Sequence, residues 1–169
     1  MAVVTVKSGS ITNRDAVPRV LNAGRVQGAP LIEMGESVTI TSGDSAASKY
    51  IFGSIPSNAL VRSLTYSAPD IGTTTTCDIG LYRTTADGGA AVDVDFWVSA
   101  VALNAGPYNK VQVIQEAGAA GGDITKFMQP VWQILGLTSD PNLIYDVIAT
   151  LVGAADGTGT LILELQYQL

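Results

Sequence analysis

Residues 60–83 read LVRSLTYSAPDIGTTTTCDIGLYR, and this stretch decides the fold class. Two strand-like runs lie on either side of Pro69-Asp70-Ile71-Gly72, whose residue types favour a tight turn. In the first run Leu64 and Tyr66 fall on one strand face by alternation, and the second run alternates in the same way. A short strand, a turn and another short strand form the basic pattern of an antiparallel β protein.

The same pattern continues on both sides of this stretch, from residue 37 onward. The expected strands are Ser37–Thr41, Lys49–Ile55, Leu60–Ala68, Cys77–Arg83, Lys110–Gln115, Leu143–Val152 and Gly159–Gln168. Turn-forming residues separate them at spacings typical of two packed sheets. The chain is therefore predicted to be all-β, an antiparallel jelly-roll-like β sandwich that occupies residues 37–169.

Two segments favour short helices instead. After Asp95, a candidate N-cap, Phe96 and Ala100 share one helical face. The second segment is Pro130–Leu135, where Pro130 suits the first helical position and Gly136 suits the stop. We expect both helices to close an end of the sandwich.

Residues 1–36 differ from the rest because Pro and Gly interrupt them and no sustained period is present, which predicts an extended N-terminal arm. Residues 1–25 hold four basic residues and one acidic residue, whereas residues 26–169 hold five basic and fourteen acidic residues. A basic arm on an acidic body is able to contact a different partner from the body. The candidate contact residues are Arg14, Arg19 and Arg25.

Two alternatives for the arm stay open. It is a solvated tail, or Val3–Val6 pairs at the edge of the sandwich as an additional strand. Binding to nucleic acid is not expected, because four dispersed cations without interleaved aromatic residues make a poor phosphate track.

The residue types needed for common catalysis are scarce. The chain has no histidine, so it lacks Ser-His-Asp and Cys-His arrangements and most zinc sites. Its single cysteine, Cys77, is expected to be a buried strand residue. Asp78, Asp93 and Asp95 are the remaining candidates for a calcium site or a glycosidase-like pair, but helix capping by Asp95 and solvated turns explain such carboxylates without chemistry, and this structural explanation is preferred. We therefore expect no enzyme activity, no metal and no cofactor.

Aromatic residues suggest one further class of function, a carbohydrate-binding jelly roll. The residues that would stack on sugars are Tyr50, Tyr82, Trp97, Tyr108 and Trp132. Because both tryptophans sit in apolar segments, burial is the preferred interpretation. Carbohydrate binding is retained as the alternative function.

Export and membrane insertion are not expected. The longest apolar runs are far shorter than the ~20 residues of a membrane-spanning helix. The first residues lack a basic leader followed by an apolar core, and one cysteine without a partner fits assembly in a reducing cytoplasm.

Six segments are informative beyond their composition: ITNRDA (11–16), GAPL (28–31), IPSNA (55–59), CDIGLY (77–82), VDVDF (92–96) and PVWQILGL (130–137). They resemble segments of a family of head decoration or cement proteins of tailed bacteriophages. In such a virion, the alternative function of carbohydrate binding would belong to a phage tail or fibre component. The resemblance covers about residues 10–168, and its motifs are structural rather than catalytic.

The resemblance implies a virion structural protein, assembled in the host cytoplasm, that binds the capsid exterior. Its expected partners are the major capsid protein, whose neighbouring subunits it clasps, and further copies of itself. Because linked copies attach more firmly than single ones, we expect a homodimer, with a trimer as the alternative.

Overall fold

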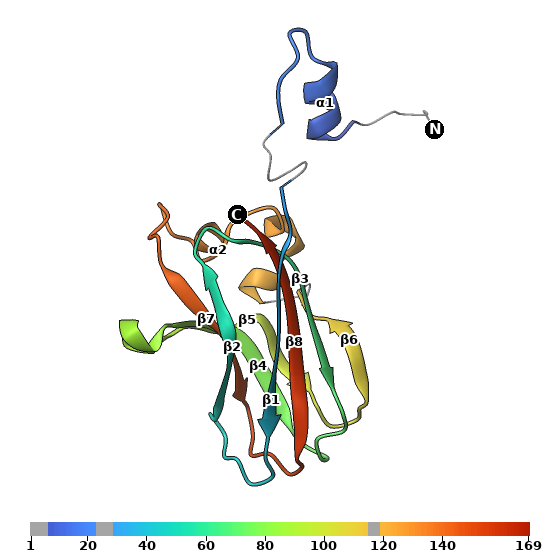
Figure 1. Ribbon diagram of the computed structural model, residues 1–169, viewed down its shortest axis with the longest axis vertical. Helices are drawn as coiled ribbons and strands as arrows, with labels where there is room; N and C mark the ends of the chain where they lie inside the picture. The colour runs from blue at the N-terminus through green and yellow to red at the C-terminus, as the bar shows by residue number, and fades with distance from the viewer. Residues whose placement is uncertain (1–6, 23–28, 115–118) are drawn as a thin grey trace. The chain divides into compact units, whose positions relative to one another are not determined.

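A computed structural model describes residues 7–22, 29–114 and 119–169 of the 169-residue chain. The chain divides into two compact units, an N-terminal unit that ends at Pro30 and a body that spans Leu31–Gln168. Figure 1 shows the strands of the body as two layers.

Eight strands build the two sheets of the described body, and every neighbouring pair is antiparallel. The first sheet has the order β1 (Ile32–Ile40), β8 (Gly159–Gln168), β3 (Leu60–Ala68), β6 (Tyr108–Gln112). The second has the order β2 (Lys49–Pro56), β7 (Ile144–Leu151), β4 (Thr76–Arg83), β5 (Ala91–Ala102). The pairs β1–β8, β2–β7, β3–β6 and β4–β5 are those of one long hairpin rolled into a jelly roll. The prediction of an antiparallel jelly-roll-like sandwich is confirmed.

The core lies between the sheets and is built by alternation. On β8, Leu161, Leu163 and Leu165 are fully buried, while the residues between them point outward. On the opposite sheet, Ile79 of β4 and Val147 of β7 belong to the same buried cluster. The alternation seen in the sequence thus marks the core face of each strand.

The helix predicted after Asp95 is wrong, because residues 91–102 form the strand β5. Phe96, Trp97 and Val98 are consecutive and all belong to the core cluster, whereas strict alternation would turn the middle one of three residues to the other face. The pairing of β5 with β4 shifts register between Ile79 and Leu81, and these irregularities turn successive apolar side chains inward. The spacing that resembled a helical face is a consequence of this bulged strand.

The second predicted helix is present as α2 (Val131–Ile134), with Pro130 as its N-cap residue rather than its first residue. The N–H of Val131 donates to the carbonyl of Ala59, and the N–H of Trp132 donates to Ser57. These bonds fix α2 to the turn between β2 and β3, and Gly136 follows it with a φ of 76°.

Other boundaries also differ from the prediction. Residues 32–36, expected in the arm, belong to β1, because Ile32 and Met34 continue the strand's alternation before Gly35. β6 ends at Gln112, whereas the predicted strand ended at Gln115, and Val3–Val6 lies outside the described residues. Short 3-10 turns occupy Thr85–Asp87, Ala120–Gly122 and Ile124–Lys126.

Candidate interaction site

The N-terminal unit contains a helix, α1 (Gly9–Asp15), where the sequence predicted extended chain. Ser8 caps it, since its side-chain oxygen accepts a hydrogen bond from the N–H of Ile11. None of its residues is buried. A seven-residue helix without a buried face has little stability of its own in water.

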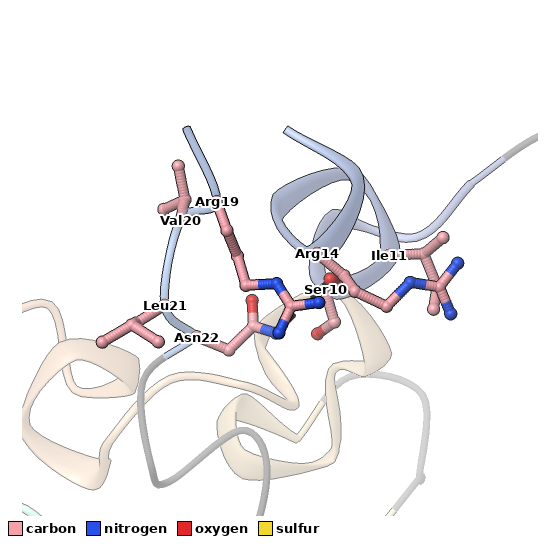
Figure 2. A pocket seen from close by; sticks show the side chains of 7 residues that line it. All are labelled: Ser10, Ile11, Arg14, Arg19, Val20, Leu21 and Asn22. Carbon is pink, nitrogen blue, oxygen red and sulfur yellow. Dashed lines mark hydrogen bonds between the residues drawn. The ribbon is translucent and has the colours of Figure 1, made fainter. Parts of the chain in front are cut away.

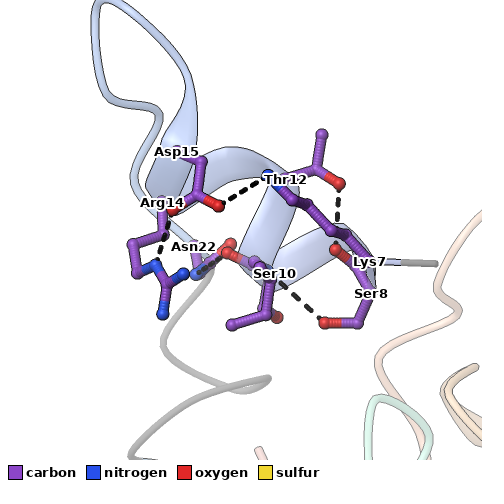
Figure 3. Close-up of polar contacts among 8 residues, drawn as sticks. Lys7, Ser8, Ser10, Thr12, Arg14, Asp15 and Asn22 are labelled. Carbon is purple, nitrogen blue, oxygen red and sulfur yellow. Dashed lines mark hydrogen bonds and ion pairs between the residues drawn. The ribbon is translucent and has the colours of Figure 1, made fainter. Parts of the chain in front are cut away.

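Hydrogen bonds hold the segment after α1 beside the helix. The side-chain amide of Asn13 donates to Asn22 at 2.8 Å, and the amide of Asn22 donates to the carbonyl of Ser10 at 3.3 Å. The N–H of Val20 donates to the carbonyl of Asn13. Residues 8–22 therefore form a small looped unit held mainly by polar contacts (Figure 3).

Asp15 organises two of the cations of this unit. Its carboxylate accepts from Lys7 Nζ at 2.9 Å and from Arg14 Nε at 2.8 Å, and these bonds hold the pKa of Asp15 below its usual range. All three side chains remain open to solvent. The outer guanidinium nitrogens of Arg14 stay available, because only its Nε donates to Asp15.

Arg14 and Arg19 line one hollow of about 290 Å³ (Figure 2). Arg14 comes from α1, and Arg19 comes from the segment that returns beside it. The full lining is Ser10, Ile11, Arg14, Arg19, Val20, Leu21 and Asn22. Two cations beside apolar side chains favour a protein partner that offers a carboxylate and an apolar residue together.

Apolar exposure is unusually high in the same unit. Val17 is 98% exposed and Leu21 is 87% exposed, and Val20 beside them is half exposed. These residues were not among the predicted contacts. The sequence signal for them is the apolar Val20-Leu21 pair directly after Arg19, in a segment that lacks strand or helix periodicity.

The structure thus brings together two of the three predicted contact residues, Arg14 and Arg19. Arg25 lies outside the described residues. Whether these arginines contact a capsid or another copy stays a prediction.

The carboxylates considered for catalysis differ in their surroundings. Asp78 accepts a hydrogen bond from the N–H of Ala100 at 2.7 Å. Burial and the neighbouring Asp95 raise the pKa of Asp93. Within residues 7–22, 29–114 and 119–169, no three acidic or cysteine side chains form a group that could hold a metal ion.

Cys77 lies fully buried in the core on β4, and this burial raises the pKa of its thiol to about 12. A thiol in this environment is protonated and unreactive at neutral pH. It contributes to packing, as its place in the buried cluster shows.

Four of the five aromatic residues considered for sugar binding have partners within the body, and the fifth, Trp132, is half-buried on α2. Trp97 and Tyr82 are buried, and Trp97 packs edge-on against Phe96 with ring centroids 5.0 Å apart. Tyr108 packs against Tyr66, and the hydroxyl of Tyr50 donates to Asp44. Among the described helices, none is long and apolar enough to cross a membrane.

The sequence matches no protein-family model, and no curated protein matches it. Two solved structures share its fold. A chain of the cyanophage Pam1 capsid asymmetric unit has 17% identity and a TM-score of 0.56, over 89% of this chain and 93% of that chain. A chain of the capsid of Ralstonia phage GP4 has 15% identity and a TM-score of 0.56, over 84% of this chain and 86% of that chain. The jelly roll described above is therefore a fold found in phage capsids.

Proposed function

We propose that this protein is a structural component of a phage virion, which binds the outer surface of the capsid and clamps neighbouring major capsid protein subunits. The observation that carries the proposal is the fold shared with chains of two phage capsids over most of this chain. The chemistry of the sequence supports it, because a chain without histidine lacks the commonest general base.

The N-terminal unit is suited to be the clamp. It presents Arg14 and Arg19 beside exposed Val17 and Leu21, and its helix has no buried face of its own. A partner surface that covers these residues supplies the burial that the unit lacks. Ordering such a segment on binding costs free energy, but it allows the segment to follow the contour between two subunits.

Clamping stabilises the head by linkage. A protein that binds the assembled lattice better than free subunits shifts the equilibrium toward the assembled state. The proposal includes attachment after synthesis in the host cytoplasm and pairing of copies, as a dimer or alternatively a trimer. Linked copies raise the effective concentration at the second site and slow release.

The test is binding to capsid particles assembled from the major capsid protein alone. Wild-type protein is expected to sediment with the particles and to raise the temperature at which they come apart. Replacing Arg14 and Arg19 together by Glu should weaken binding at least tenfold, because two attractive contacts become repulsive. Binding by the wild type should also fall as salt rises.

Lys110→Glu together with Lys126→Glu is the matched control, since the pair makes the same change of charge on the body. It should leave capsid binding unchanged. Wild-type protein that fails to sediment with the particles, or that binds soluble glycans instead, would contradict the proposed function.

A further inference from the structure

The sandwich has two ends, and different elements close them. The α2 end, as we call it, holds α2, the turn 57–59, the first residues of β1 and β7 and the last residues of β8 (Figure 1). The other end holds the connections 41–48, 69–75, 103–107 and 152–158, and we call it the turn end. The side chains exposed at the two ends are of different kinds.

Exposed apolar side chains gather at the α2 end. Of nine large apolar residues exposed on the described body, four lie at this end, with exposed fractions between 41% and 53%. They are Leu31, Met128, Leu137 and Ile144. In the four connections of the turn end, all of which the structure describes, Val152 is the single exposed residue of this kind.

The turn end is acidic instead. Its connections contain Asp44, Asp70 and Asp156 but no lysine or arginine. Its other large apolar residues, Ile71 and Leu103, are fully buried. An acidic and mostly polar surface is the kind that stays in contact with water.

Hydrogen bonds around Ser57 hold part of the exposed apolar group together. The N–H of Trp132 donates to the carbonyl of Ser57 at 3.0 Å, and the N–H of Leu137 donates to the carbonyl of Trp132 at 3.1 Å. The hydroxyl of Ser57 accepts from the N–H of Leu143, the residue before Ile144, at 3.1 Å. Trp132 is half-buried, and Leu137 and Ile144 are exposed. We call Trp132, Leu137 and Ile144 the α2 patch.

The α2 patch is suited to contact with another protein. A tryptophan among aliphatic side chains, without a charged residue between them, is typical of the centre of an interface. A single exposed apolar residue needs no explanation, but a group of them around a tryptophan indicates a contact surface.

The N-terminal unit is attached to this end of the body. The body begins at Leu31, directly before β1. Positions 22 and 31 are nine residues apart, so the chain between them spans at most about 32 Å. The ten residues of β8 run from the turn end to the α2 end and span about 33 Å. A partner held by residues 8–22 is therefore tethered beside the α2 end, and it reaches the turn end only along a fully extended chain.

We propose that the α2 patch docks on an apolar surface of the major capsid protein, and that the turn end faces solvent, away from the shell. The inference deepens the proposed function and rests on it, because it takes the capsid subunit held by the N-terminal unit as the partner. Two contacts joined by a short tether raise each other's effective concentration, so a small patch is sufficient. The carboxylates of the turn end stay hydrated in this orientation.

The first experiment compares the two ends of β7. Ile144 begins the strand at the α2 end and Val152 follows it at the turn end, and their side chains are 53% and 49% exposed. In the full-length protein, Ile144→Asp should weaken sedimentation with particles of the major capsid protein at least tenfold, because it places a charge in an apolar contact. Val152→Asp is the matched control and should bind like the wild type.

Leu137→Asp provides a second variant in case Ile144→Asp does not fold, as judged by circular dichroism. Folded variants at both positions that bind particles like the wild type would overturn the inference and leave the proposed function standing. So would a Val152→Asp protein that is equally impaired. A wild type that does not bind particles would contradict the proposed function and, with it, the choice of partner.

Sedimentation equilibrium without particles tests whether a second copy occupies the patch instead. The free Ile144→Asp protein should self-associate to the same extent as the wild type. A variant that loses self-association but still binds particles would show that the patch joins copies of this chain, and would overturn the inference.

The second experiment maps the orientation of the body with exposed thiols. Because Cys77 is buried and unreactive, Ser139→Cys at the α2 end and Ser45→Cys at the turn end each add one accessible thiol, since both serines are exposed. On particles, a maleimide should modify the thiol at position 139 about tenfold more slowly than in the free protein, and the thiol at position 45 at an unchanged rate. Protection of position 45, or no protection of position 139, would overturn the inference.

Discussion

The two outer faces of the sandwich differ although their central strands occupy equivalent places. On β8, the outward residues Thr160, Ile162, Glu164 and Gln166 are exposed or half-buried. On β7, three of the four outward residues are buried, and only Ile144 is exposed. The first face, on the sheet β1-β8-β3-β6, is polar and open to solvent. The second, on the sheet β2-β7-β4-β5, is covered by its own side chains, and we call it the packed face.

The difference shows that a jelly roll does not need two equal surfaces. A strand with one solvated face reads as alternating apolar and polar residues, and β8 follows this rule. Most residues of β7 are buried on both faces of the strand, which is typical of a strand that has side chains packed over both faces. Burial of this kind on an outer face shows that the chain covers that face with its own side chains.

The largest effect is expected at a glycine of the packed face. In Gly80→Ala, the new Cβ would lie 2.2 Å from the backbone oxygen of Asp93 and the strand β5 cannot retreat without breaking its pairing. We expect a loss of about 3 kcal/mol or more in the free energy of unfolding. Urea denaturation measures it.

Gly35 on the polar sheet is the matched position, because the nearest atom to an added Cβ is Cγ of Glu164 at 4.0 Å. Gly35→Ala should be neutral or stabilising by up to about 1 kcal/mol. Equal losses in the two variants would refute the contrast between the faces.

A smaller effect is expected from removing one hydroxyl of the packed face. Tyr82→Phe leaves the buried Thr150 hydroxyl without its partner, which should cost about 1–2 kcal/mol of stability. On the polar face, Lys110→Met removes the exposed ion pair with Glu164, whose atoms are 2.9 Å apart. That change should leave the melting temperature nearly unchanged at ordinary salt. A destabilised Lys110→Met beside an unaffected Tyr82→Phe would reverse the comparison.

The contact between the β3–β4 and β7–β8 connections, which run between the two sheets, should lose stability in acid. We call this contact the joint. Asp156 lies in the β7–β8 connection and accepts hydrogen bonds from Thr73 N and Thr75 Oγ1 of the β3–β4 connection, each at 2.9 Å. These and neighbouring bonds hold the pKa of Asp156 well below its usual range. Because the folded pKa is lower than the unfolded one, the carboxylate stabilises the fold at neutral pH. This contribution is lost as the pH falls below about 4.

Asp156→Asn should therefore lower the melting temperature at pH 7, and the difference from the wild type should shrink below about pH 4. Thermal unfolding between pH 7 and pH 2 measures it, with Asp70→Asn in the β3–β4 connection as the control. A difference that stays constant over this range would show that the charge of Asp156 does not stabilise the joint.

The smallest effect on stability is expected from removing residues 1–25. The N-terminal unit has no buried helix residue, so the melting temperature of the body should change by less than about 2 °C. Capsid attachment should weaken strongly. A truncated protein that aggregates would instead support the alternative in which Val3–Val6 completes an edge of the sandwich.

Much of the fold is predictable because turns and alternation are local signals. Six of the eight strands were predicted within a few residues, and β1 was predicted only over its second half, since Gly35 interrupts its pattern. β5 was missed because a bulged strand places Phe96 and Trp97 on the core side together. Only the partner strand determines such a bulge, and a window of sequence does not contain that partner.

The candidate site is less predictable from sequence. Charge identified Arg14 and Arg19, and the structure places both at one hollow. The cap Ser8 was available as a signal for α1, but a single cap without an apolar face does not predict a helix.

Cys77 gives the molecule a built-in reporter. Its thiol is the single one in the sequence, is fully buried on β4, and has a pKa raised to about 12. A thiol-specific reagent therefore cannot modify the folded protein, and the rate of modification equals the rate at which the sandwich opens or follows its open population. The same label, applied to the protein alone and to the protein mixed with capsid particles, would report any stabilisation of the sandwich on binding as a ratio of two modification rates.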